Sequence, residues 1–343
     1  MFETLKSSLG NLEVYKLLNT STGEYVAILS AAGAALNAFK VKSAGLLVDV
    51  VDGYEDESDF RVNHSRDFKG AKLFPFPNRV SQARYRFEGV DYELGINFHE
   101  EGHAIHGLLY GKPFRVLNQW ATTAEAGLEL THHYSGEDRG YPFPFSINVR
   151  FIYRRDNSLS CRTVVKNTGA RPMPLGDGWH PYFRTGSAVD TLELQLPVNR
   201  RLEVNDRKIP EGGWTEYSKF RGLARIGEER FDHCFELGRG GGGARSLLYD
   251  PGTQLGLILW QETGPGKYNY LQVYTPPGRR SIALEPMSCP PDGLNNGIDL
   301  IRLGADQEVS FSWAIEVVYP STEGRLRARA SRKGPLADNG EEL

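Results

Sequence analysis

Three histidines and two glutamates lie within the eleven residues 97–107, NFHEEGHAIHG. His99, Glu100 and His103 fit H-E-x-x-H, a pattern that binds zinc in peptidases when it lies on a helix and both histidines share a face. Gly102 lies inside this motif and further glycines flank it, which makes helix formation unfavourable. We therefore expect a polar loop with solvated His99 and His103 rather than a zinc peptidase site.

The third histidine of the segment has different surroundings. His106 lies in AIHGLL, between apolar residues and before a glycine. A lone histidine in such a setting is usually structural. A catalytic or binding function of His106 would need partner residues elsewhere in the chain, and the secondary-structure elements would have to position them.

Apolar residues alternate with polar ones along much of the chain, which is typical of half-buried β-strands. The clearest runs are 145–151, 159–165, 192–196 and 309–317. Shorter apolar segments are EYVAIL, LLVDVV, RYRFEG, LELTHHY, LGLILW, YLQVY and SIALE. Thirty-eight glycines and nineteen prolines fit many turns, and no segment has a convincing amphipathic helical pattern of three turns. The pattern predicts an all-β, mostly antiparallel sandwich with few short helices.

The chain as a whole has an ordinary composition, with 40% hydrophobic residues and a formal net charge of -3. This balance gives no reason to expect binding to nucleic acid or to an anionic membrane surface. The start of the sequence lacks a secretory signal, and the longest uncharged stretch, 25–39, is too short to span a bilayer. Three scattered cysteines indicate neither a disulfide framework nor a cysteine zinc site. We expect a cytoplasmic protein.

We predict one domain over residues 1–320 and a flexible C-terminal tail over 321–343. The segment GRGGGGA, 238–244, contains G-x-G-x-x-G, but a strand-like sequence rather than a helical one follows it. A dinucleotide site of this kind needs a helix at that place. The segment is therefore expected to be a loop.

Several separated motifs resemble the aldose 1-epimerase, or galactose mutarotase, family. FKGAKLFPFPNRVSQARYRFEGVDYELGIN resembles its signature stretch and contains Arg79, and His106-Gly107 follows at the family's spacing. The later matches are GDGWHPYFR, RFDHCF, LQVYTP and ALEPMSCPPDGLN, which contain His180, Asp232, Gln272 and Glu285. The motifs occur in the family's order over residues 68–295.

The resemblance implies a single-domain galactose mutarotase-like supersandwich with an active site in a cleft. It implies Glu285 as the catalytic base and His180 as the catalytic acid, with Arg79, His106, Asp232 and Gln272 binding the sugar. Anomer inversion by ring opening needs one base and one acid on the two oxygens of C1. It requires no metal and no redox cofactor.

The resemblance leaves several alternatives open. The substrate could be a free hexose or a phosphorylated or otherwise modified sugar, and Arg84, Arg184 or Arg221 could serve a phosphate. The scaffold could also be a non-catalytic carbohydrate-binding protein. A small-molecule sugar is the expected partner, and the protein is expected to be a monomer or a homodimer.

Overall fold

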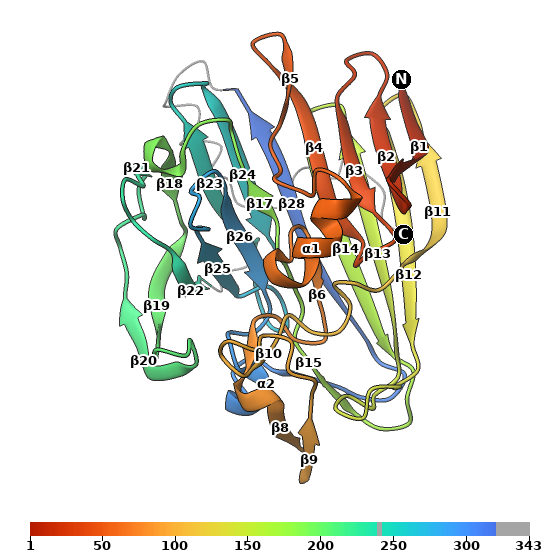
Figure 1. The fold of residues 1–343 in the computed structure, drawn as a ribbon, viewed down its shortest axis with the longest axis vertical. Helices are drawn as coiled ribbons and strands as arrows, with labels where there is room; N and C mark the ends of the chain where they lie inside the picture. Colours follow the sequence, from red (N-terminus) through yellow and green to blue (C-terminus); the bar gives the residue numbers. More distant parts are fainter. Residues whose placement is uncertain (239–241, 320–343) are drawn as a thin grey trace.

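The computed structural model describes residues 1–238 and 242–319. It is an antiparallel β-sandwich (Figure 1), as the alternating pattern predicts, and every pair of named strands in the described residues is antiparallel. The tail 321–343 and the residues 239–241 of the glycine-rich segment lie outside the described residues.

A nine-stranded sheet forms one layer. Its strands in spatial order are β11 (Arg115–Ala121), β12 (Glu125–Tyr134), β13 (Phe145–Arg154), β14 (Ser158–Asn167), β28 (Glu308–Val318), β24 (Leu255–Gln261), β23 (Ala244–Asp250), β18 (Glu193–Gln195) and β21 (Ala224–Arg225). The three longest predicted strands, β13, β14 and β28, are neighbours in its centre. The inward residues of β13 are buried at every second position, which confirms the predicted alternation.

Two further sheets form the opposing layer. The five-stranded sheet contains β1 (Phe2–Leu9), β2 (Leu12–Asn19), β3 (Tyr25–Leu29), β4 (Ala35–Ser43) and β5 (Leu46–Asp49). The eight-stranded sheet contains β20 (Pro210–Glu216), β19 (Val198–Val204), β22 (Asp232–Leu237), β25 (Tyr270–Tyr274), β26 (Ile282–Met287), β16 (Gly178–Trp179) and β6 (Lys72–Leu73), with β17 (Tyr182–Phe183) also paired to β26.

Aromatic contacts from β13 show that both sheets cover the same face of the nine-stranded sheet. The Tyr153 ring lies 5.5 Å from Phe2 and 5.6 Å from Phe39 of the five-stranded sheet. The Phe151 ring lies 5.6 Å from Trp179 of the eight-stranded sheet. One buried apolar cluster includes residues from all three sheets. Burial of this surface is the main stabilising contribution to such a sandwich.

The remaining elements are short. Three two-stranded sheets pair β7 (Arg79–Val80) with β10 (Ala104–Ile105), β8 (Arg84–Phe87) with β9 (Val90–Glu93), and β15 (Met173–Leu175) with β27 (Ile301–Leu303). The helical segments are α1 (Glu57–Asp67), α2 (Gly293–Asn296), η1 (Ser81–Ala83) and η2 (Val189–Thr191). No helix in the described residues is long and apolar enough to cross a membrane.

Helix α1 has 11 residues, and its sequence has no amphipathic pattern, in line with the sequence analysis, so that such a pattern could not have predicted this helix. It has no apolar stripe and buries only Phe60. Its start is fixed instead by the Asp56 carboxylate, which accepts a hydrogen bond from the Asp59 amide at 2.8 Å. Capping and charges, rather than amphipathicity, therefore define this helix.

Candidate active site

Three adjacent strands of the eight-stranded sheet form the floor of the candidate site. Gln272 on β25 pairs directly with Glu285 on β26, and Asp232 on β22 pairs with Tyr274 two residues further along β25. Because side chains alternate between faces, Asp232, Gln272 and Glu285 lie on one face. The Gln272 Nε2 donates to Asp232 Oδ1 at 2.9 Å.

His180 lies between the short strands β16 and β17. Its backbone N–H donates to Ala71 at 3.1 Å, and its carbonyl accepts from Gly70 at 2.9 Å. The imidazole stacks on Tyr182, with ring centroids 4.8 Å apart and planes 15° apart. These contacts place His180 Nε2 3.4 Å from Glu285 Oε1. The two residues that the family resemblance assigns to acid and base are therefore side by side.

His106 follows β10 and has a left-handed backbone with φ of 63°. Its N–H donates to the Asn78 carbonyl at 3.0 Å, and its Nδ1 accepts from the Asn78 N–H at 3.2 Å. Because Nδ1 is an acceptor, the proton of the neutral ring is on Nε2. The His106 ring lies 5.1 Å from that of His180. His106 thus offers one N–H donor beside the acid–base pair.

Arg79 reaches the site from β7 and is held by the histidine-rich loop. Its Nε and Nη2 donate to the Glu101 carboxylate at 2.5 and 3.1 Å, and its guanidinium lies over the Phe98 ring. A bidentate pair of this kind fixes the orientation of the guanidinium. The sequence analysis did not identify Glu101, nor Asn78, although Asn78 is the asparagine of the Asn-Arg motif.

The H-E-x-x-H segment is a turn, as predicted, in which the Phe98 carbonyl accepts from the N–H groups of Gly102 and His103. His99 is exposed. The expectation of a solvated His103 was wrong, because its side chain is buried and its Nδ1 accepts from the Gln82 N–H at 3.0 Å. His103 serves the packing of this loop.

Burial governs the charges of the central groups. It lowers the pKa of His180 to about 3 and the pKa of His106 well below its ordinary value, which the neighbouring His180 and Arg79 lower further. It raises the pKa of Glu285 well above its ordinary value; Asp232 adds to this effect and the Arg79 charge opposes it. Both shifts favour the neutral side chain, so burial disfavours the charged form of the His180–Glu285 pair.

Three buried polar atoms of the cluster have no hydrogen-bond partner among the described residues: His180 Nδ1, Gln272 Oε1 and Glu285 Oε2. Buried polar atoms are otherwise nearly always paired in proteins. Their concentration around one point indicates a place for a polar ligand, which would supply the missing hydrogen bonds.

The same cluster has donor atoms that a metal could use. One ligand atom each from His106, His180 and Glu285 lie within 4.8 Å of one another. Two histidines and a glutamate are a known zinc ligand set, in which neighbouring donors are about 3.3 Å apart. A test of metal dependence therefore belongs with any assay of this site.

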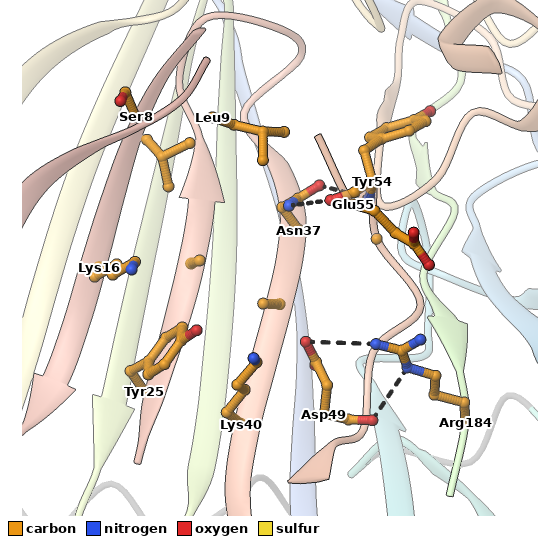
Figure 2. Close-up of a pocket in the computed structure, with 14 residues that line it drawn as sticks. Ser8, Leu9, Lys16, Tyr25, Asn37, Lys40, Asp49, Tyr54, Glu55 and Arg184 are labelled. Carbon is orange, nitrogen blue, oxygen red and sulfur yellow. Dashed lines mark hydrogen bonds and ion pairs between the residues drawn. The ribbon is translucent and has the colours of Figure 1, made fainter. Parts of the chain in front are cut away.

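A separate hollow of about 290 Å³ lies over the five-stranded sheet (Figure 2). Its lining includes Tyr25, Lys16 and Lys40, and Arg184, which lies 3.7 Å from Asp49. The other two arginines considered for a phosphate lie near Glu93 and Glu216. The three arginines thus face carboxylates outside the cluster of His106, His180 and Glu285.

The family model described as aldose 1-epimerase matches residues 16–316, and the chain belongs to this family. YihR from Escherichia coli K12 is 31% identical to this chain over 247 residues, which cover 68% of this chain and 74% of YihR. YphB from the same organism is 32% identical over 276 residues, which cover 72% of this chain and 83% of YphB. A galactose mutarotase-like protein from Clostridium acetobutylicum has a similar structure, with a TM-score of 0.81, 14% identity and coverage of 93% and 99%. The family membership supports an isomerase that acts on sugars.

Proposed function

We propose that this protein is an aldose 1-epimerase, a mutarotase that interconverts the α and β anomers of a hexose by acid–base ring opening and closure. The observation that supports this most directly is the buried pair of His180 and Glu285, whose Nε2 and Oε1 are 3.4 Å apart. The anomeric oxygen and the ring oxygen of the sugar are both bonded to C1. A base and an acid this close together can therefore contact the two oxygens at the same time.

Glu285 is the base in this proposal. Its Oε2 has no partner in the described residues and accepts the proton of the C1 hydroxyl. His180 donates a proton to the ring oxygen, the C1–O5 bond breaks, and the open aldehyde forms. The pair has then moved one proton from His180 to Glu285, and closure on the other face of the aldehyde returns it. No net proton is gained or lost.

The remaining residues bind the sugar in this proposal. The Nε2–H of His106 and the guanidinium of Arg79 donate to oxygens close to C1, because the His106 ring lies 5.1 Å from the His180 ring and the Arg79 charge acts on Glu285. Asp232 and Gln272 extend from the pair along the sheet and bind hydroxyls further around the ring. The cost of leaving these buried groups unpaired makes such contacts selective.

A panel of aldoses tests the proposal. Anomer interconversion is followed by NMR exchange or polarimetry, with and without enzyme, for neutral hexoses and their 6-phosphates. We expect a large acceleration for at least one hexose, unchanged after treatment with a chelator. Acceleration of 6-phosphates alone would support the modified-sugar alternative, and binding without acceleration would support a carbohydrate-binding protein. Activity lost on chelation and restored by zinc would replace the metal-free mechanism.

A further inference from the structure

The turn between β19 and β20 brings a second cation to the candidate site. The Asn205 side chain accepts from the N–H groups of Arg207 and Ile209 at 3.0 and 3.1 Å, which fixes the turn. Lys208 at its tip has a left-handed backbone with φ of 60°, a conformation that a β-carbon disfavours. The turn therefore holds Lys208 in a defined direction.

Two contacts fasten this turn to opposite sides of the site. Lys208 Nζ lies 3.3 Å from Asp232 Oδ2, and the guanidinium of Arg207 donates to the Glu101 carbonyl. Glu101 in turn holds Arg79 through its carboxylate. The turn thus reaches from the acceptor on β22 to the loop that positions Arg79, and it forms a wall of the site.

Lys208 and Asp232 place a hydrogen-bond donor, the ammonium, beside a hydrogen-bond acceptor, the carboxylate. Asp232 Oδ1 accepts a hydrogen bond from the Gln272 amide, and Asp232 Oδ2 forms an ion pair with the Lys208 ammonium. The ammonium has three N–H donors, and its contact with Asp232 is the single polar contact found for it within the described residues. The Lys208 side chain is 36% exposed, so its other donors remain accessible.

We propose that Lys208 is a further substrate-binding residue, which acts with Asp232 to bind two neighbouring hydroxyls of a neutral sugar. This inference rests on the proposed function of the site. Lys208 donates to one hydroxyl while Asp232 accepts from the other. The positive charge of Lys208 is balanced by Asp232, which suits a diol better than a phosphate, whereas an unpaired lysine would favour the anion.

Lys208→Met and a set of monodeoxy hexoses test the inference. The variant keeps the length of the side chain but removes its donors. We expect kcat/KM for the parent hexose to fall about 10- to 100-fold, mostly through KM, since a hydrogen bond from a charged group is lost. For the one deoxy sugar that lacks the contacted hydroxyl, the variant and the wild type should be equal. Lys208→Arg should restore part of the loss.

Lys219→Met is the matched control, because Lys219 pairs with Glu229 in a similar exposed ion pair. It should leave every kinetic constant unchanged, and thermal melting should show that both variants fold. An equal loss on all deoxy sugars, or no loss at all, would overturn the inference while leaving the proposed function intact. A larger loss on a hexose 6-phosphate than on the neutral hexose would overturn it in favour of anion binding. If wild-type enzyme accelerates no sugar, the proposed function itself fails.

Discussion

His180 and Glu285 are both buried, and burial disfavours the charged side chains that their proposed functions need. These are a protonated His180 as the acid and an ionised Glu285 as the base. The pKa of His180 falls to about 3 and that of Glu285 rises, mainly because water is excluded from both. Each shift favours the neutral side chain, so burial favours the arrangement in which Glu285 holds the proton of the pair and His180 is neutral. In the charged form, protonated His180 lies beside ionised Glu285, and only the position of this proton differs from the neutral form. The pKa values seen in a titration therefore describe the pair and not either residue alone.

The dependence of kcat/KM on pH tests this description. The pair holds one proton at pH values above the lowered pKa of His180 and below the raised pKa of Glu285. Activity should therefore persist on the acid side below the ordinary range of a glutamate, and it should fall as the pH rises through the raised pKa of Glu285, when the pair loses its proton. The measurement is enzyme-catalysed mutarotation from below about pH 4.3 to about pH 9, corrected for the uncatalysed rate. A loss of activity on the acid side that follows the ordinary glutamate pKa of about 4.3 would contradict this description.

At the residue scale, the candidate site residues that lie in recognisable motifs could be predicted from the sequence. The residues that orient their side chains could not. Arg79, His106, His180 and Glu285 stand in short segments that can be matched one by one. Asn78 acts on His106 through its backbone N–H, and Glu101 acts on Arg79 from a loop. Such contacts depend on the folded path of the chain and have no local sequence pattern.

At the scale of elements, the long central strands were predicted because their period-two patterns are strong. Helix α1 was missed because its sequence is polar on nearly every side. A buried ion pair between β6 and the residue before β16 was also not predicted. Lys72 and Asp177 are 105 residues apart, and the distance between Nζ and Oδ1 is 2.5 Å.

This ion pair supports the segment that leads to His180. Both side chains are completely buried, and the Tyr268 hydroxyl also donates to the Asp177 carboxylate at 2.5 Å. The Lys72 ammonium lies 4.6 Å from the centre of the Trp179 ring, next to His180 in the chain. Burial lowers the pKa of Lys72 and raises that of Asp177, while their mutual attraction opposes both shifts.

Asp177→Asn should lower the free energy of unfolding by about 3–5 kcal/mol, because it leaves the buried Lys72 charge without a partner. Urea denaturation followed by circular dichroism measures this. A double variant, Lys72→Met with Asp177→Leu, should recover much of the loss, since it removes both charges. A loss below about 1 kcal/mol in the single variant would show that the pair does not support this part of the fold.

At the scale of the whole molecule, the sandwich brings together segments from distant parts of the sequence. His106, the segment containing His180 and the strand of Glu285 meet at one buried point, although His106 and Glu285 are separated by about half of the chain. Composition and alternation predict the sandwich but not this meeting point, because the order of strands in the sheet is not written in any one segment.

The assignment of Glu285 as the catalytic base is tested by the rate of anomer interconversion by Glu285→Gln, measured by NMR exchange on the hexose that the wild-type enzyme accelerates most. Glu262→Gln, a change at a carboxylate paired with Lys267, is the control. We expect Glu285→Gln to fold and to bind the sugar but to lose about 10²–10⁴ in kcat. His180→Asn should lose a similar amount, while the control keeps full activity. A correctly folded Glu285→Gln protein with a nearly wild-type rate would show that Glu285 is not the catalytic base.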